Sequence, residues 1–406
     1  MRTISYIHRY LGWISGAIVA ILCATGLILL LQPDIERVVE PERFRLPESA
    51  QIDAPIDLDS ALENFTRRET ESFDDPTTIA VSRLYLPNSP KRPLRAIVEA
   101  RNAKTNWTYL AYFDPHAGEG VAYGPSKTID FFKTVRRLHT SLCIQPRNVG
   151  RQIVGWATVL FIFTLLTGLV RWFPRRWTKT STKAAFVSSF KHGAFRAIYD
   201  VHKVWGFYAT AVLLLLALTG VWISFPGARD AFDKAIRYDK AAYVAPTFDV
   251  APDKAGEAGE VGEATLQAIL DGQNAKTPGV DYDVFFNPKA ATVVFSRNGG
   301  FCVPTRYYWN RRTGDFLGEE AYGDLPFGHK IRRVIMPIHK GVFWGDVTRV
   351  IFALGCLVGV IAAVTGYWLT LKRWDREEKS AKRSVVENNN FDDSEDKAPS
   401  EKDVRE

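Results

Sequence analysis

Four long apolar stretches constrain this chain more than any other feature of its sequence. They cover residues 11–31, 153–173, 204–225 and 347–371, and each has 21 to 25 residues. About 20 helical residues cross a hydrocarbon core about 30 Å thick, so each stretch is long enough to span a bilayer. The sequence therefore predicts an α-helical membrane protein with four spans. The first stretch is too long for a signal peptide and no cleavage site follows it, which predicts an uncleaved anchor.

Basic residues indicate which side of the membrane each loop occupies. The loop between the second and third spans carries seven Lys and Arg residues against one acidic residue, Asp200, and the segment after the last span begins with Lys372 and Arg373. Because Lys and Arg concentrate on the cytoplasmic side, we expect both termini and this loop to be cytoplasmic, in a bacterial inner membrane. The net charge of +7 then reflects membrane topology, and we expect no nucleic-acid binding.

The spans divide the chain into eight segments. Two long polar segments, 33–138 and 227–338, lie outside and are expected to fold as two separate α+β domains. The last segment, 372–406, is a cytoplasmic tail that we expect to be disordered from about 384, because few apolar residues follow that point. The other predicted segments are span 1 (1–32), an interfacial segment with span 2 (139–173), the basic loop (174–203), span 3 (204–226) and an interfacial segment with span 4 (339–371).

The two halves of the chain, 1–175 and 200–373, repeat one pattern. Each span contains a Thr-Gly pair, and a histidine precedes each pair along the chain. The same order in both halves predicts a tandem duplication, with the two copies related by an axis normal to the membrane. The four histidine–glycine couples are His8 and Gly26, His139 and Gly168, His202 and Gly220, and His339 and Gly366, separated by 18, 29, 18 and 27 residues.

Such a bundle would bring the histidines together as two pairs, one near each membrane face. His8 and His202 would form the inner pair, and His139 and His339 the outer pair. Two imidazoles facing each other across a helical bundle suit haem iron, because they supply both of its axial ligands. Ionisable groups inside membranes are rare and usually functional. The sequence therefore predicts two b-type haems with these four histidines as iron ligands.

The glycines fit the same hypothesis. Eighteen residues make five helical turns, so His8 and Gly26 share one helix face. Gly26 and Gly220 would leave room for the outer macrocycle, and Gly168 and Gly366 for the inner one; ordinary small-residue packing between helices is an alternative that stays open. Basic residues beside the ligand histidines would pair either with haem propionates or with lipid headgroups, and these are Arg9, Arg137, Lys203 and Lys340.

The outer histidines pose a geometric problem. A straight helix from His139 to Gly168 would be about 43 Å long, which exceeds the hydrocarbon core. The chain must therefore break, and we expect a short interfacial helix that carries each outer histidine. Residues suited to such breaks are Pro146 and Gly150 in the first half, and Gly341 and Gly345 in the second.

Several residues have weaker assignments. His116, His192 and His329 are predicted to lie on the surface, and His329 is the best candidate for a spare ligand. Cys143 and Cys302 would face the same oxidising compartment, where a disulfide between them is one option. No CxxC or CxxCH motif occurs, so zinc ribbons and covalently attached haem have no support.

The segment His-Arg-Tyr-Leu-Gly-Trp at residues 8–13, followed by a span with a Thr-Gly pair and repeated around the outer segments, resembles the PepSY-associated transmembrane family. The resemblance covers about residues 1–373. The family includes iron-regulated membrane proteins and ferrisiderophore reductases. The resemblance therefore implies a four-span dihaem protein that passes electrons to a ferric chelate or siderophore outside the membrane, with the same four histidines as ligands.

The resemblance also implies PepSY-like outer domains, each a helix packed on a small antiparallel sheet. Patterns in the outer segments fit such domains, and the segment 253–263, rich in Gly, Ala and Glu, is expected to be a flexible insertion. We expect a helix from residue 60, strands over 95–100, 107–114 and 293–296, and similar hairpin turns at 113–119 and 308–315.

The electron donor is expected to be a separate molecule. No glycine-rich dinucleotide fingerprint follows a strand, so the chain carries no recognisable nicotinamide or flavin site. A cytoplasmic reductase or a membrane quinol would fill this role. Two other functions stay open: a non-catalytic sensor that binds a partner through its outer domains, and a permease for siderophores or metals, although four spans leave little room for a channel.

Overall fold

The computed structural model of the chain divides into two compact units, each continuous in space but not in sequence. The helical unit contains Met1–Gly26, His139–Ser224 and Leu354–Glu406, and the sheet unit contains Leu27–Leu138 and Phe225–Ala353. The structure describes residues 2–50, 56–73, 75–121, 127–191, 193–243, 265–287, 292–298 and 303–395.

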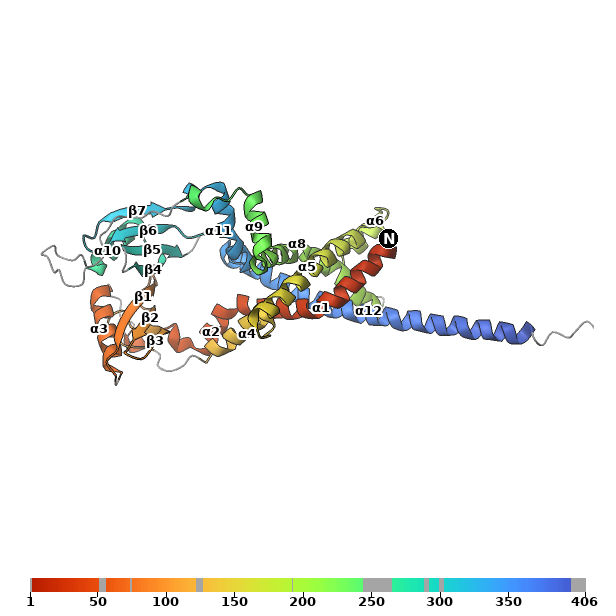
Figure 1. Ribbon diagram of the computed structural model, residues 1–406, viewed down its shortest axis with the longest axis horizontal. Coiled ribbons are helices and arrows are strands. Elements are labelled where there is room, and N and C mark those ends of the chain that lie inside the picture. Colours follow the sequence, from red (N-terminus) through yellow and green to blue (C-terminus); the bar gives the residue numbers. More distant parts are fainter. Residues whose placement is uncertain are drawn as a thin grey trace, which may run out of the picture. The chain divides into compact units, whose positions relative to one another are not determined.

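Four helices of the described chain are long and apolar enough to cross a membrane. They cover Thr3–Leu30, Arg147–Trp172, Ala194–Ser224 and Gly345–Lys382. The four predicted spans are therefore confirmed as helices, and the chain is a multi-pass membrane protein. The helices that contain them are α1 (Arg2–Leu30), α5 (Arg147–Trp172), α8 (Gly206–Ser224), which continues α7 (Ala194–Asp200) through the π-helical segment η3 (Val201–Trp205), and α12 (Gly345–Glu395) (Figure 1).

The helical unit is held together by close packing of small residues. Cys23 of α1 and Leu213 of α8 are buried in its core, against apolar side chains of α5 and α12. A Cβ atom added to Gly359 would lie 2.7 Å from Cys23 Sγ, and one on Gly355 would lie 2.6 Å from Val212 Cγ1. Since a Cβ atom does not approach another heavy atom so closely, the helices lie as near to each other as only glycine permits.

Short helices carry the two predicted outer histidines, as expected. His139 lies near the end of α4 (Ile129–Ser141), and His339 is the last residue of α11 (Phe327–His339). The second break contains Gly341 and Gly345, both with positive φ, as expected. The first break lies at residues 142–146, so the expectation of a break at Gly150 is wrong, because this residue lies inside α5.

The sheet unit contains one seven-stranded antiparallel sheet in the order β3-β2-β1-β4-β5-β6-β7. The expectation of two separate outer domains is corrected, because strand β1 of the first segment pairs with β4 of the second, from Arg83 opposite Phe285 to Leu86 opposite Tyr282. This pairing covers what would be an exposed edge in each half. The strands are β1 (Thr78–Leu86), β2 (Leu94–Arg101), β3 (Asn106–Phe113), β4 (Asp281–Asn287), β5 (Thr292–Asn298), β6 (Arg306–Asn310) and β7 (Phe316–Glu320).

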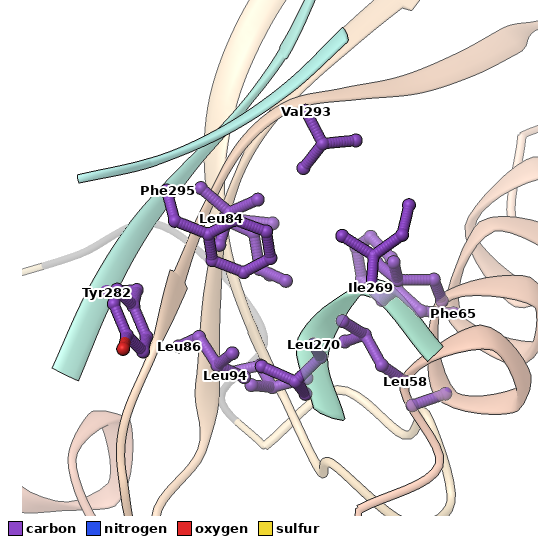
Figure 2. Close-up of a cluster of buried hydrophobic side chains, with 14 of the residues drawn as sticks. Leu58, Phe65, Leu84, Leu86, Leu94, Ile269, Leu270, Tyr282, Val293 and Phe295 are labelled. Atoms are coloured by element: carbon purple, nitrogen blue, oxygen red, sulfur yellow. The ribbon is translucent and has the colours of Figure 1, made fainter. Parts of the chain in front are cut away.

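One hydrophobic core serves both halves of the sheet. Helices α3 (Leu58–Glu71) and α10 (Leu266–Lys276) pack on it, and Figure 2 shows Phe65 and Leu84 of the first half in the same cluster as Ile269 of the second. The expected helix and strands are confirmed, since they fall within α3, β2, β3 and β5 apart from one residue at the end of β3.

The two helices of the sheet unit cap each other. The carboxylate of Asp59, in the first turn of α3, accepts hydrogen bonds from the backbone N–H groups of Leu266 (2.9 Å) and Gln267 (2.8 Å) in α10. In return, Gln267 Oε1 accepts a bond from the backbone N–H of Leu58 in α3 (2.9 Å). Each helix thus satisfies amide groups that its partner leaves unpaired at its N-terminus.

The predicted hairpin turns have the same hydrogen bonds in both halves. Asp114 Oδ1 accepts from the backbone N–H groups of the residues two and three positions later, and Asn310 Oδ1 does the same. Gly118 and Gly314, four residues after each, have positive φ values of 66° and 73°. The two halves thus share one turn structure, and the duplication itself stays a prediction.

Three further expectations are wrong in the described part of the chain. The tail is helical to Glu395, well beyond residue 384, and charge pairs four residues apart support this helix as far as Lys382, as in the pair of Glu378 with Lys382 at 2.7 Å. His329 is buried, with Nε2 2.8 Å from the carbonyl oxygen of Asp239, so it is a structural residue and not a surface one. His116 is half-buried, with a buried Nε2.

Some expectations concern residues outside the described ranges. These are the surface position of His192, the insertion at 253–263, and the pairing of Cys143 with Cys302, since Cys302 lies outside the described ranges.

The remaining α-helices are α2 (Gln32–Val39), α6 (Lys179–Phe186) and α9 (Pro226–Ala235).

Candidate functional site

The helical unit encloses a cavity of about 600 Å³. Its walls come from α1, α5, α8 and α12, together with the segment that leads into α8. Most of the wall is apolar, and His8 and His202 are among the polar residues that line it. A cavity of this size, with few polar groups in an apolar wall, is typical of sites for cofactors and other small molecules.

His8 is held by a helix other than its own. It lies in α1, and its Nδ1 is 3.0 Å from the backbone carbonyl oxygen of Thr164 and 3.2 Å from Thr167 Oγ1, both in α5. The carbonyl oxygen can only accept, so Nδ1 must carry the hydrogen of the neutral ring. This assignment leaves the lone pair on Nε2, which has no hydrogen-bond partner within the described residues.

His202 is held in the same way by α12. Its Nδ1 is 3.0 Å from the carbonyl oxygen of Ala362 and 3.0 Å from Thr365 Oγ1. The same argument assigns the hydrogen to Nδ1 and the lone pair to Nε2. Unlike His8, this residue lies in the π-helical segment Val201–Trp205. A π-helical segment is a local widening of a helix and often marks a functional position. No feature of the sequence predicted it.

The structure thus brings together the predicted inner pair. The ring centroids of His8 and His202 are 6.3 Å apart, and the ring planes are inclined by 73°. Each ring has Nδ1 fixed by a neighbouring helix, and both residues line the same cavity. Two neutral imidazoles with free lone pairs are chemically suited to bind one metal ion from two sides.

Glycine makes room for each imidazole. A Cβ atom on Gly168 would lie 3.0 Å from His8 Cε1, and one on Gly366 would lie 3.1 Å from His202 Cε1. The sequence suggested that these glycines leave space for a macrocycle, whereas in the structure their neighbour is the edge of a histidine ring. These two Thr-Gly pairs therefore each hold a histidine from another helix, with a threonine acceptor for Nδ1–H and a glycine beside Cε1.

His139 has the same surroundings as the inner pair. Its Nδ1 is 2.9 Å from Thr25 Oγ1 in α1, and its Cε1 would lie 3.4 Å from a Cβ on Gly26. The Thr25 hydroxyl donates to the carbonyl oxygen of Ile21 and can therefore accept from Nδ1–H. His339 belongs to the sheet unit, so its pairing with His139 stays a prediction, as does the role of Gly220 in α8.

Positive charge gathers in the cavity wall. Two of the predicted basic residues, Arg9 and Lys203, line the cavity, whereas Arg137 and Lys340 do not. Sequence reasoning missed three arginines in the wall, although an Arg-Trp pair near the end of the second and fourth spans was a signal for two of them. The missed residues are Arg171, Arg373 and Arg376.

The cavity has one acidic residue, Glu377, which bridges two of these cations. Its Oε1 is 3.2 Å from Nη1 of Arg9 and 2.9 Å from Nε of Arg373. The guanidinium carbon of Arg376 lies 4.3 Å from the centroid of the Phe195 ring. Within the described part of the chain, no group of three or more His, Cys, Asp and Glu residues is placed to hold a metal ion, so a metal here would rely on the two imidazoles.

Comparison with known proteins agrees with the architecture. No curated protein matches the chain. A family model described as the PepSY-associated TM region matches residues 5–373, which include all four spans, both outer segments and the cavity histidines. The chain therefore belongs to the PepSY-associated transmembrane family.

Proposed function

We propose that the cavity binds a haem between His8 and His202, and that the protein transfers electrons within the membrane. The distance between the two rings carries this proposal. A metal–imidazole bond is about 2.0 Å long, and the atoms of a five-membered ring with bonds of about 1.33 Å lie about 1.1 Å from its centre, so two imidazoles on opposite sides of one metal ion have centroids about 6.2 Å apart. The observed distance of 6.3 Å agrees with this value.

The tautomers of the two histidines support the same proposal. Iron binds an imidazole through a lone pair, and in both rings this lone pair is on Nε2 because Nδ1 donates to a carbonyl and a hydroxyl oxygen. Such bonds fix the orientation of a ligand ring and raise its basicity. A haem held by two imidazoles supplies one-electron redox chemistry. The chain contributes ligand position, ligand basicity and a water-poor wall.

The second proposed haem lies between His139 and His339. It rests on the sequence repeat and on the surroundings of His139, whose Nδ1 meets a threonine hydroxyl and whose Cε1 lies beside a glycine. Because His8 and His202 have the same type of neighbours, His139 is equipped to act as the same type of ligand. Two haems near opposite faces would give electrons a route across the bilayer.

We propose a ferric chelate, such as a siderophore complex, as the electron acceptor outside the membrane. Family membership supports this assignment, since the family includes proteins of iron acquisition. The reduction itself would release iron, because a ferric ion attracts anionic oxygen ligands more strongly than a ferrous ion does. In this proposal the protein is a haem-dependent ferric-chelate reductase of the inner membrane, supplied with electrons by a cytoplasmic reductase or a quinol.

The absorbance spectrum of the purified protein tests the haem proposal. We expect the narrow visible bands of low-spin haem with two imidazole ligands, and close to two haems per chain. His202→Ala should remove about half of the haem, while His116→Ala, which changes a histidine of an outer hairpin turn, should leave the content unchanged. A colourless protein from cells supplied with haem, or a His202→Ala variant with full haem content, would refute the assignment.

Reoxidation tests the proposed acceptor. The protein is reduced with dithionite, freed of excess reductant, and mixed with ferric citrate or a ferric trihydroxamate under argon. We expect the spectrum to return to the oxidised form while a ferrous-specific dye develops colour. The amount of ferrous ion formed should equal the amount of haem oxidised. A reduced protein that persists with both chelates would exclude ferric-chelate reduction, yet it would leave the haem assignment intact.

A further inference from the structure

The cavity carries an excess of positive charge that its own residues do not balance. Five basic side chains line it, against the single carboxylate of Glu377. The basic residues are Arg9, Arg171, Lys203, Arg373 and Arg376.

Three of these cations already have partners inside the protein. Arg373 bonds to Glu377, and Arg376 lies over the ring of Phe195. Lys203 Nζ donates to the carbonyl oxygen of Ala184 at 3.5 Å. These contacts hold three of the five basic side chains in place; the other two are Arg9 and Arg171.

Two arginines of the wall differ from these three, because Arg171 has neither a counter-ion nor a ring contact among the described residues and Arg9 keeps a buried nitrogen without a partner. The side chain of Arg9 is 8% exposed; one of its terminal nitrogens bonds to Glu377, but its buried Nε has no partner. Arg171 makes no hydrogen bond or ion pair with any residue that the structure describes. It lines the same cavity as Arg9 and both histidines.

An unpaired guanidinium in a largely apolar wall is costly, because it has lost water without gaining a counter-ion. A bound anion would remove this cost. We propose that Arg171, together with the free Nε of Arg9, binds the carboxylates of the porphyrin, which rests on the proposed haem function. Guanidinium groups pair with carboxylates through two parallel hydrogen bonds, so this subsite would set the orientation of the macrocycle as well as its affinity.

A phosphate of a membrane lipid is the other source of an anion at this depth. The position of Arg171 in the wall that His8 and His202 also line favours the porphyrin, since a ligand held by the imidazoles would carry its carboxylates into the same cavity. The two sources differ in one respect that is measurable: only the porphyrin has carboxylates that esterification can neutralise without changing the iron or its axial ligands.

The test compares haem with its dimethyl ester. The full chain in detergent is stripped of haem and titrated with iron protoporphyrin IX or with the ester, for the natural protein and for Arg171→Gln and Arg175→Gln. The natural protein should bind the free acid at least tenfold more tightly than the ester, because hydrogen bonds to charged groups are worth about a factor of ten or more. Arg171→Gln should lose about tenfold for the acid and nothing for the ester.

Arg175→Gln is the matched control, since it removes the same charge four residues later from an exposed arginine outside the cavity wall. It should keep the natural preference for the acid. Equal binding of acid and ester by the natural protein would overturn the proposal, as would an equal loss for both ligands in Arg171→Gln. Failure of the natural protein to bind either porphyrin would overturn the haem assignment itself, and this subsite with it.

A lipid phosphate would give a different result. The haem-free natural protein would then gain thermal stability from added phosphatidylglycerol, Arg171→Gln would not, and neither protein would distinguish acid from ester. This outcome would assign Arg171 to the bilayer and refute the carboxylate subsite.

Discussion

Gly168→Ala should weaken haem binding without weakening the fold. The new Cβ would lie 3.0 Å from Cε1 and 3.5 Å from Nδ1 of His8. Carbon atoms attract each other best at about 3.5–4.0 Å, so the imidazole must move by about 0.5 Å to relieve the contact. A rigid ring moves as one body, and Nε2 is displaced along with Cε1.

The size of the effect follows from how tightly the ring is held. Its Nδ1 makes bonds of 3.0 Å and 3.2 Å to α5, the same helix that would carry the new methyl group, so the push also strains these bonds. A shift of about 0.5 Å equals the tolerance of a well-built binding site. We therefore expect haem affinity to fall about tenfold, the lower end of the effect seen when support behind a metal ligand is disturbed.

The free energy of unfolding of haem-free Gly168→Ala should be equal to that of the natural protein or higher, although haem binds more weakly. Alanine is favoured over glycine by about 1 kcal/mol inside a helix, so Gly168→Ala should not unfold more easily in the haem-free state. This difference in sign separates a displaced ligand from a damaged bundle. Gly227→Ala is the matched control, because this helical glycine of the sheet unit has nothing within 4 Å of an added Cβ.

The assay measures haem loss to an excess of apomyoglobin and the thermal unfolding of the haem-free protein. We expect faster haem loss from Gly168→Ala than from the natural protein, and no change for Gly227→Ala. If Gly168→Ala lost haem at the same rate as the natural protein and had the same spectrum, haem binding would not depend on the position of His8. This result would refute the role of His8 as a ligand.

Three further predictions concern hydrogen bonds. Thr167→Val and Thr365→Val each remove a hydroxyl that accepts from a ligand Nδ1–H, so the less basic ring should raise the midpoint potential of the haem in a spectroelectrochemical titration; an unchanged potential in both variants would contradict this. Asp59→Ala removes the carboxylate that caps α10 and should lower the free energy of unfolding by about 1–2 kcal/mol, measured by denaturant titration of the full chain. Burial raises the pKa of Glu320, but hydrogen bonds from Arg333 and a tyrosine hydroxyl outweigh this and hold it below its usual value of 4.5. The stabilisation is therefore complete above about pH 4.5 and is lost as the pH falls, so Glu320→Gln should be less sensitive to acid unfolding than the natural protein.

The spans and the inner pair were predictable because local patterns specify them. Apolar length alone identifies a membrane helix, and His8 and His202 stand at equal distances from a Thr-Gly pair. The contacts of Gly168 and Gly366 were not predictable in the same way. Spacing along a helix shows which residues share a face, but it does not show which neighbouring helix that face meets.

The outer segments show the same limit. Strands such as β2 and β3 follow from alternating side chains, whereas the pairing of β1 with β4 joins residues about 200 positions apart and leaves no local signal. The helical tail was missed for a different reason. Its composition resembles a disordered segment, but it continues the last membrane helix, in which oppositely charged residues four positions apart, such as Asp375 and Lys379 at 3.2 Å, already favour helix beyond the apolar stretch.

Small-residue packing was the main alternative to a ligand-holding role for the Thr-Gly pairs, and the other glycines of the spans help to separate the two. Gly16 of α1 receives the ring of Tyr367, and its neighbour Ser15 is not a threonine. Gly355 and Gly359 of α12 receive Val212 and Cys23. These glycines pack helices together, and none of them follows a threonine.

Threonine precedes glycine where the neighbour is an imidazole. This holds for Gly26, Gly168 and Gly366, and in each case the threonine oxygen lies 2.9–3.2 Å from Nδ1 of the histidine that the glycine accommodates. Packing alone has no use for the hydroxyl, since any small residue would serve. A hydroxyl that accepts from Nδ1–H satisfies a buried donor and keeps the lone pair of the neutral ring on Nε2, the nitrogen through which the proposed haem would be bound. These three Thr-Gly pairs are therefore better explained as supports for histidines, which the proposed haem function requires, than as helix contacts.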